Sequence, residues 1–354
     1  MSLRQEARRA HPDFAWLEPD DAPAVEAWLR ARGWLAPNES FVRSERAGEG
    51  NMNLVLRIHT TRRSLVVKQA RPWVEKYDQI AAPWDRALVE QRFYARVAEI
   101  PLVAAGMPKL LAADAPARAH LLEDLSPARD CAFVYAREGA GLGEPVLVAL
   151  ACWLRALHAG TAGPAEPAFA NREMRALQAE HVFHVPYADP PALDLDALEP
   201  GLAAAGRALA SDAAFRAALA ATEAAYLADG RCLVHGDFFP GSWLLAAGGV
   251  RVIDPEFGFW GDPELDLGVA VAHLALAGAG EGAATTLLGA YRSAEDAPAV
   301  DLGGIARSAA AEVARRVLGV AQLPLRTPAG GRAELVARAR EAMVAGEARM
   351  LFGS

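Results

Sequence analysis

A chain of 354 residues exceeds the size at which one hydrophobic core usually stops growing, so we expect two domains with a cleft between them. Hydrophobic residues make up 53% of the chain, yet no stretch of about 18 uncharged apolar residues occurs, which argues against a membrane span. A formal charge of -8, without any block of interleaved basic and aromatic residues, makes nucleic acid an unfavourable partner.

The N-terminus and the cysteines favour a cytoplasmic protein. Residues 1–10 are rich in charge and have no apolar segment behind them, so no secretory signal is expected. Cys131, Cys152 and Cys232 are odd in number and widely spaced, which fits neither a disulfide framework nor a zinc site. We expect all three cysteines to be reduced.

The first third of the chain has strand chemistry at its centre. Residues 53–59 and 64–69 are apolar or β-branched runs joined by a polar turn, which predicts a hairpin. Apolar residues at helical spacing over 84–100 predict a helix packed on that hairpin. Two further strands are expected at 110–111 and 120–122. Ser126-Pro127 then breaks the pattern, so we predict a lobe of residues 1–125 with a hinge at 122–126.

From residue 146 onward the sequence is mostly helical. Helices are predicted over 147–158, 201–228 and 305–322, and loops over 186–200 and 324–331. Two apolar runs, 232–234 and 250–253, interrupt the helices and end in acidic residues. We therefore predict an α+β, protein-kinase-like fold: a small N-terminal lobe of antiparallel sheet that binds nucleotide, and a larger, mainly helical lobe, 126–354, for catalysis and acceptor binding.

The two acid-tipped strands predict a phosphotransferase. His235-Gly236-Asp237 follows the first strand and Asp254-Pro255-Glu256 follows the second. In a kinase-type site one acid meets a substrate hydroxyl while others hold metal-bound phosphate. Asp237 is our candidate base, and His235 is expected to form structural hydrogen bonds in preference to acting as a base.

The second motif is the candidate metal site. Residues two apart on an extended segment face the same side, so Asp254 and Glu256 can reach one Mg²⁺ cluster. Ser242 stands where protein kinases carry a metal-binding asparagine, and its hydroxyl is a weaker ligand for which Glu256 would compensate. The alternative is a polar turn with solvated acids.

The N-terminal lobe carries the candidate phosphate contacts. Gly48 and Gly50 precede a predicted strand, where glycines let backbone amides approach phosphate oxygens, although glycines before a strand more often form an ordinary turn. Lys68 lies within an apolar strand and needs a partner, which ATP phosphates and a helix carboxylate would supply. We choose Glu90 for that carboxylate; the alternative is a solvated lysine on an edge strand.

Several stretches along nearly the whole chain carry a family resemblance. They are residues 48–55, 67–70 with 73–74, 123–126, 171–174, 180–183, 186–187, 235–237, 241–242, 253–257 and 315–316. Together they resemble the methylthioribose kinase family, within the wider aminoglycoside phosphotransferase and choline kinase group. The resemblance implies an ATP-dependent, Mg²⁺-dependent kinase that phosphorylates a small hydroxylated acceptor, with the anomeric hydroxyl of 5-methylthioribose as the leading site. Kinases of this kind are often dimeric, so a homodimer is one expected assembly.

The resemblance also assigns residues. Asn51 and Lys68 would contact the nucleotide phosphates, and the hinge would hold adenine through backbone groups. Arg315 and Arg316 would face the acceptor and the transferring phosphate, where a guanidinium stabilises developing charge. The alternative for the two arginines is a helix surface paired to Glu312 or to solvent. The complete set of expected nucleotide contacts is Gly48, Gly50, Asn51, Asn53, Lys68, Glu90, Leu122, Glu123, Asp124 and Leu125.

Two departures from the family pattern keep the acceptor open. Phe239 stands where the family usually has histidine, which would reshape the acceptor pocket, and residues 261–268 follow the general pattern of the wider group. We expect Asp262 and Asp266 to organise the loop by hydrogen bonds. Trp243, Phe257, Phe259 and Trp260 would supply an apolar acceptor pocket, unless they belong to the core.

Two other functions remain open from the sequence. An aminoglycoside- or choline-type acceptor is one, although a polycation would be repelled by the two arginines. A nucleotide-binding pseudokinase is the other, and Ser242 is the feature that favours it.

Overall fold

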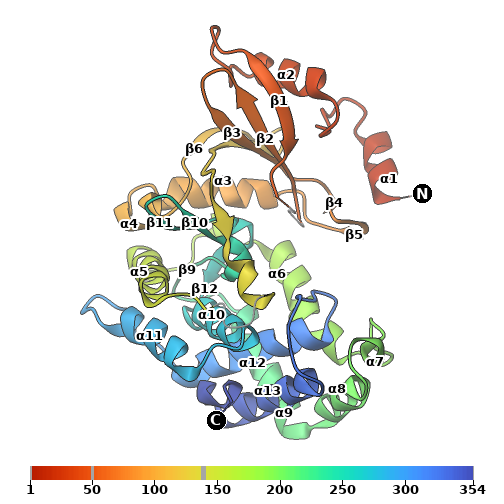
Figure 1. Ribbon diagram of the computed structural model, residues 1–354, viewed down its shortest axis with the longest axis vertical. Helices are drawn as coiled ribbons and strands as arrows, with labels where there is room; N and C mark the ends of the chain where they lie inside the picture. Colours follow the sequence, from red (N-terminus) through yellow and green to blue (C-terminus); the bar gives the residue numbers. More distant parts are fainter. Residues whose placement is uncertain (1, 49–51, 137–140, 354) are drawn as a thin grey trace. The chain divides into compact units, whose positions relative to one another are not determined.

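The computed structural model describes residues 2–48, 52–136 and 141–353. The chain forms two compact units, Met1–Pro127 and Ala128–Ser354. Figure 1 shows strands concentrated in the first unit and helices in the second. Within the described ranges, every helix is too short or too polar to cross a membrane.

The first unit is built on a five-stranded antiparallel sheet in the order β1-β2-β3-β7-β6. Its strands are β1 (Phe41–Arg46), β2 (Leu54–Thr60), β3 (Ser64–Gln69), β6 (Leu110–Asp114) and β7 (Ala119–Glu123). The predicted hairpin is confirmed as β2 and β3, whose register runs from Leu54 opposite Gln69 to His59 opposite Ser64. The edge strand β1 was not predicted, because charged residues alternate along it in place of an apolar run.

Period-two burial holds this sheet in place. Leu54, Leu56 and Ile58 of β2 are buried on one face and belong to the same core as Val25 and Leu29 of α2 (Ala22–Ala31). The predicted helix is confirmed as α3 (Arg86–Val97). The remaining elements of this unit are α1 (Leu3–Ala10), β4 (Trp73–Val74), β5 (Tyr77–Ala81) and α4 (Pro101–Ala105).

The second unit is mainly helical, as predicted, but two expected boundaries were wrong. The helix expected over 201–228 is two helices, α8 (Leu202–Ser211) and α9 (Ala213–Leu227), because Asp212 is extended and caps α9 by accepting from the Phe215 amide at 2.8 Å. The loop expected over 186–200 contains the short helix α7 (Leu195–Leu198), capped in the same way by Asp194. The other α-helices are α5 (Glu144–Gly160), α6 (Arg172–Ala179), α10 (Glu264–Leu276), α11 (Glu281–Arg292), α12 (Leu302–Leu318) and α13 (Gly331–Ala345).

Two small sheets position the acidic motifs. Strand β9 (Cys232–Val234) pairs with β12 (Phe259–Gly261), while β10 (Trp243–Ala246) lies between β11 (Gly249–Val252) and β8 (Arg129–Asp130). The first acidic motif leaves β9 and the second leaves β11. The predicted α+β class, with a small antiparallel sheet and a larger helical part, is confirmed.

Candidate active site

A buried carboxylate fixes the backbone of the loop that follows β9. Asp266, on α10, accepts hydrogen bonds from the His235 amide at 2.7 Å, the Gly236 amide at 2.9 Å and His158 Nε2 at 3.1 Å. Burial raises the pKa of Asp266, but the hydrogen bond and charge of His158 outweigh it, so the pKa is lowered and the group is an anion. The organising role predicted for Asp266 is confirmed. Asp262 has a different contact, an ion pair with Arg231 at 3.2 Å.

The turn into Asp237 requires glycine. Gly236 has a φ of +84°, and a Cβ there would lie 2.3 Å from the carbonyl oxygen of Phe257. His235 is fully buried and its Nε2 donates to the Ile253 carbonyl at 2.9 Å, which confirms its structural role. This bond ties the Asp237 loop to the strand end that carries Asp254.

Asp237 faces both predicted arginines. Its Oδ1 lies 3.7 Å from Nη1 of Arg315 and 3.8 Å from Nη2 of Arg316. These are ion-pair distances beyond hydrogen-bond range. No other described residue donates a hydrogen bond to this buried oxygen. The carboxylate is therefore held in a positive environment, with Oδ1 buried on the side of the arginines and the side chain as a whole 17% exposed.

Glu312 holds the two arginines in place. Arg316 donates from Nε to Glu312 at 2.6 Å, and Arg315 donates from Nη1 at 3.1 Å. Burial raises the pKa of Glu312, but the charges of Arg315 and Arg316 outweigh burial. The pKa of Glu312 therefore lies well below its usual range. The predicted pairing of the arginines with Glu312 is confirmed, but the helix-surface position is wrong, because the Arg316 side chain is buried and that of Arg315 is only 11% exposed. Their contact with the acceptor and the transferring phosphate stays a prediction.

A neutral histidine and a tyrosine complete this network. His273 lies 3.0 Å from Glu312 through Nε2 and 2.6 Å from the Tyr135 hydroxyl through Nδ1. Burial lowers the pKa of His273 and raises that of Tyr135. A neutral ring with an ionised Glu312 assigns the proton to Nε2, so Tyr135 donates to Nδ1. Every group behind the arginines has a fixed hydrogen-bonding role.

Phe239 belongs to the same cluster. Its ring lies 4.9 Å from the guanidinium carbon of Arg316 and 5.3 Å, between ring centroids, from His273. An aromatic face attracts a guanidinium without accepting one of its directed hydrogen bonds. The departure noted in the sequence thus provides Arg316 with an apolar support.

The candidate metal ligands are grouped by the turn after β11. Asp254 has a φ of +63°, a left-handed conformation uncommon for a non-glycine residue, and it precedes the single helical turn Pro255–Phe257. Asn171 braces that turn by donating to the Glu256 carbonyl at 3.1 Å. Ser242 is buried, and its hydroxyl donates to the Asp237 carbonyl at 3.1 Å.

The oxygen donors of this turn suit Mg²⁺. Among the described residues, no three His, Cys, Asp or Glu side chains gather in a metal-binding cluster. Magnesium typically takes one or two carboxylates and completes its shell with water and phosphate oxygens. The sequence expectation that Asp254 and Glu256 share a side because the segment is extended was wrong, since a left-handed residue and a helical turn occupy these positions. That the two carboxylates hold one Mg²⁺ with the Ser242 hydroxyl stays a prediction.

The first unit contains the predicted lysine pair. Lys68 Nζ lies 2.7 Å from Oε2 of Glu90, and both side chains are buried. Burial raises the pKa of Glu90, but the charges of Lys68 and His120 outweigh it and lower the pKa. The predicted ion pair is confirmed. The edge-strand alternative is wrong, because β3 lies between β2 and β7.

The other residues expected to contact the nucleotide in this unit differ in their surroundings. Gly48 has a φ of +75° after β1, whereas Gly50 and Asn51 lie outside the described residues. Asn53, directly before β2, is buried and accepts a hydrogen bond from Arg86 Nε at 3.0 Å, a contact with α3 that the sequence did not suggest. The side-chain oxygen of Asn53 therefore has a structural role in holding Arg86.

The predicted hinge begins at the end of β7. Leu122 and Glu123 are the last residues of that strand, and the Glu123 amide donates to the Lys109 carbonyl at 3.0 Å. The Asp124 carboxylate accepts from Arg57 at 3.0 Å. Leu125 follows directly, so a nucleotide base would have to use backbone groups other than the Glu123 amide.

Sequence reasoning missed some residues of the site and misplaced others. The missed residues are Tyr135, His273 and Gln178. Gln178 donates to the Gly236 carbonyl at 2.8 Å. None of the three could be recognised from the sequence, because the stretches around them are apolar or carry no motif. The aromatics proposed for an acceptor pocket are buried residues of the core, with exposures of 9% or less. They are Trp243, Phe257, Phe259 and Trp260.

A family model described as "Phosphotransferase enzyme family" matches residues 44–302. The chain belongs to this family. Among family relatives, methylthioribose kinase of Exiguobacterium sibiricum is 31% identical over 252 residues, covering 66% of this chain and 61% of that protein. Methylthioribose kinase of Cronobacter sakazakii is 30% identical over 264 residues, covering 71% and 64%. The chain thus spans less than two thirds of the length of these relatives.

Solved structures show a similar fold. Choline kinase LicA from Streptococcus pneumoniae has a TM-score of 0.55 at 15% identity, over 92% of this chain and all of that one (100%). A choline/ethanolamine kinase family protein from Mesorhizobium loti also has a TM-score of 0.55, at 19% identity, over 93% and 99%. At these identities the likeness concerns the fold alone.

Proposed function

We propose that the protein is an ATP-dependent small-molecule kinase that transfers the γ-phosphate to a sugar hydroxyl. The leading acceptor is 5-methylthioribose, with its 1-phosphate as product. The observation that carries the proposal is Asp237 lying 3.7 and 3.8 Å from two arginines that Glu312 holds in place. The names of the curated relatives support this choice of acceptor.

Asp237 is the proposed catalytic base. Its carboxylate would accept a hydrogen bond from the acceptor hydroxyl, orient the hydroxyl oxygen toward the γ-phosphorus, and take the hydroxyl proton as the new O–P bond forms and the bond from the γ-phosphorus to ADP breaks. Arg315 and Arg316 are the proposed stabilisers of charge on the transferring phosphoryl group. Because Glu312 fixes them beforehand, they would require little reorganisation at the moment of transfer.

We assign the remaining candidate residues to binding of the nucleotide and the metal ion. In the lobe of residues 1–125, Lys68, oriented by Glu90, would contact phosphate oxygens, with Gly48, Gly50 and Asn51 beside them. Backbone groups of the hinge at 122–126 would hold adenine. In the lobe of residues 126–354, Asp254 and Glu256 would hold Mg²⁺, which neutralises phosphate charge when bound.

The cationic environment of Asp237 also bears on the alternatives. Arg315 and Arg316 are only 11% and 8% exposed, so their charges are weakly screened by solvent. A polycationic aminoglycoside or a quaternary amine would be disfavoured beside them, whereas a neutral sugar would not. Residues 237, 254 and 256 are all acidic, which argues against a pseudokinase.

An acceptor screen tests the proposal. ADP release would be followed with 5-methylthioribose, ribose, an aminoglycoside, choline and homoserine, with and without Mg²⁺. We expect preference for 5-methylthioribose and loss of about 10²–10⁴ in kcat for Asp237→Asn with little change in ATP affinity. Asp296→Asn, a change at a carboxylate that is 69% exposed, serves as the matched control and should behave as wild type.

Each result has a clear reading. Preference for choline or an aminoglycoside would refute the sugar acceptor. Wild-type turnover of Asp237→Asn would remove Asp237 from the mechanism, and nucleotide binding without turnover of any acceptor would favour the pseudokinase. We further expect a cytoplasmic homodimer, and a monomeric mass in light scattering would refute the dimer.

A further inference from the structure

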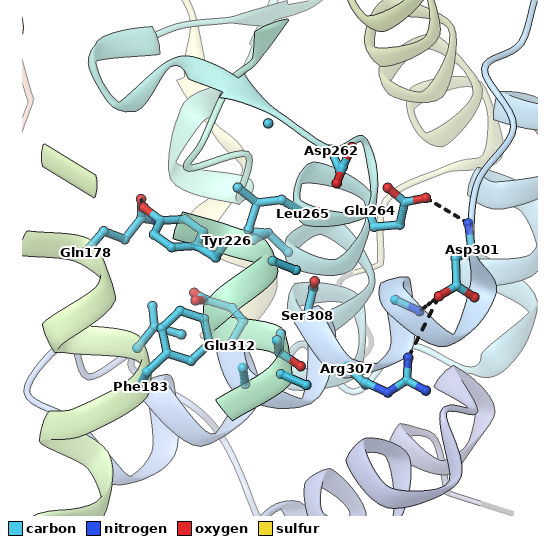
Figure 2. A pocket seen from close by; sticks show the side chains of 18 of the residues that line it. Gln178, Phe183, Tyr226, Asp262, Glu264, Leu265, Asp301, Arg307, Ser308 and Glu312 are labelled. Atoms are coloured by element: carbon cyan, nitrogen blue, oxygen red, sulfur yellow. Dashed lines mark hydrogen bonds and ion pairs between the residues drawn. The ribbon is translucent and has the colours of Figure 1, made fainter. Parts of the chain in front are cut away.

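Two buried carboxylates lie outside the proposed catalytic loop and differ in their partners. Glu264 of α10 accepts from the amide of Asp301 at 2.7 Å and so holds the residue that caps α12 (Figure 2 draws this contact). Glu90 of α3 instead contacts two side chains, Lys68 and His120. The proposed function uses Lys68 but gives His120 no role.

His120 lies beside Lys68 on one face of the sheet. The two residues are directly opposite each other in the antiparallel register of β3 and β7, so their side chains project to the same side. Helix α3 packs against β7, where Gln91 donates from Nε2 to the Ala119 carbonyl at 3.1 Å. This bond joins the neighbours of Glu90 and His120 in the chain, and Glu90 is therefore within reach of both side chains.

The two oxygens of Glu90 have different partners. Oε2 lies 2.7 Å from Nζ of Lys68, and Oε1 lies 3.3 Å from Nε2 of His120. All three side chains are buried. Neither Glu90 nor His120 has another hydrogen-bond partner within residues 2–48, 52–136 and 141–353. A buried polar atom without a partner is costly, so the contact between Glu90 and His120 stabilises both groups.

The ionisation of Glu90 determines where His120 carries its proton. Burial raises the pKa of Glu90, but the charges of Lys68 and His120 outweigh burial and lower this pKa to about 2. An ionised carboxylate only accepts hydrogen bonds, so the ring must present a protonated Nε2 to Oε1. This assignment holds for a neutral ring and for an imidazolium alike.

The contact of His120 with Oε1 also affects Lys68. A lysine ammonium has three N–H donors, and a contact with one carboxylate oxygen leaves the others for a phosphate group. Without His120, the Glu90 carboxylate could turn both oxygens toward Lys68, which would then be its one remaining charged partner of the described residues. Lys68 would be held more tightly and would have fewer donors left for a ligand.

We propose that His120 is a positioning residue for binding of the nucleotide phosphates. It holds Oε1 of Glu90, so that Glu90 orients Lys68 through Oε2 alone and leaves the other ammonium donors to phosphate oxygens. This inference rests on the proposed function, which assigns Lys68 to the phosphates. It concerns the phosphate groups and not adenine or ribose, so adenosine is the reference ligand for its test.

Calorimetry on the full chain, with Mg²⁺ and without an acceptor, would compare ATP with adenosine. His120→Gln places a side-chain amide near the position of Nε2, whereas the shorter His120→Asn reaches only the position of Nδ1. We expect His120→Asn to weaken ATP binding about tenfold and to leave adenosine binding unchanged, since a hydrogen bond to a charged group is lost. His120→Gln should bind both ligands within about twofold of wild type.

Two further variants locate the effect. His59→Asn is the matched control, because His59 lies 2.9 Å from Glu45 in a second histidine–glutamate pair of the same sheet, and it should bind both ligands as wild type. Glu90→Gln removes the charge through which His120 is proposed to act. Adding His120→Asn to Glu90→Gln should therefore cause no further loss of ATP affinity. His120→Leu, which lacks the donor, replaces His120→Asn in these comparisons if that variant does not fold.

Each other outcome would count against the proposal. Unchanged ATP affinity in His120→Asn, or equal losses in His120→Asn and His120→Gln, would overturn it. A parallel loss of adenosine affinity would show a merely structural role, and a full further loss in the Glu90→Gln background would show that His120 acts by another route. Wild-type protein that binds no ATP would instead refute the proposed function. ATP binding without phosphorylation of any acceptor would refute the kinase and leave the role of His120 standing.

Discussion

Replacing Glu312 with glutamine tests whether the arginines beside Asp237 are held in advance. The substitution keeps the shape of the side chain but removes the charge that accepts from Arg316 at 2.6 Å, Arg315 at 3.1 Å and His273 at 3.0 Å. Removing one partner from a buried ion pair usually costs about 3–5 kcal/mol. Because glutamine still offers one acceptor oxygen, we expect about 3 kcal/mol.

That cost should appear in thermal unfolding and in turnover. For a unit of this size, 1 kcal/mol shifts the melting temperature by about 2–4 °C, so Glu312→Gln should lower it by about 6–12 °C. The arginines, now lacking Glu312, should also close on Asp237 from their present 3.7 and 3.8 Å, which would weaken it as a base and lower kcat. Circular dichroism and steady-state ADP release measure the two effects.

The pH dependence gives an independent check. The pKa of Glu312 lies well below its usual 4.5, so its stabilisation is complete above that value and is lost only as pH falls through the lowered pKa. The gap in stability between wild type and Glu312→Gln should therefore be full at neutral pH and narrow in acid. The control is Glu341→Gln, on the exposed side of α13. A variant that matches this control in melting temperature and in kcat would refute the reasoning.

Three further predictions address other contacts. Lys68→Met, which leaves the buried Glu90 without its ammonium partner at 2.7 Å, should raise the KM for ATP and destabilise the first unit; unchanged KM and unfolding would contradict both roles. Gly236→Ala should lower stability and abolish turnover, because its Cβ would lie 2.3 Å from the Phe257 carbonyl oxygen at a φ of +84°; calorimetry showing wild-type unfolding would exclude this strain. The pKa of His273 is lowered by burial, so the unfolded chain takes up a proton near pH 6.5 before the folded chain does, and stability falls as pH drops below that value. His273→Gln should flatten this part of the stability curve between about pH 7 and 5, and an unaltered slope in urea titrations would refute the assignment.

Features that follow from a regular residue pattern, or from a charged residue that needs a partner, could be predicted from the sequence. Alternating apolar residues identified β2 and β3, and a lysine inside such a strand required an acid, which proved to be Glu90. The strand β1 was not predicted because an edge strand needs no continuous buried apolar run. Its charged residues also interrupt the alternation of apolar and polar residues that identifies a strand. Asp212 divided a predicted helix because its capping bond competes with a continuous helix, whatever the periodicity around it.

Long-range contacts explain most of what the sequence could not reveal about the site. Glu312 lies three and four residues before the arginines, so helical spacing made it a candidate partner. Nothing local indicated that His273, 39 residues earlier, would share that carboxylate, or that Tyr135, 138 residues before His273, would support the ring. Such contacts depend on how α10 and α12 pack, which a single sequence does not display.

The carboxylate of Asp266 has a consequence for the loop that carries Asp237. Asp266 accepts hydrogen bonds from the amides of His235 and Gly236, directly before Asp237. The Ser242 hydroxyl, further along the loop, donates to the Asp237 carbonyl. Because these anchors are made to the backbone, the path of the loop does not depend on the side chain at position 239. A phenyl ring at this position can therefore pack against Arg316 and His273 while the backbone on either side of it stays anchored.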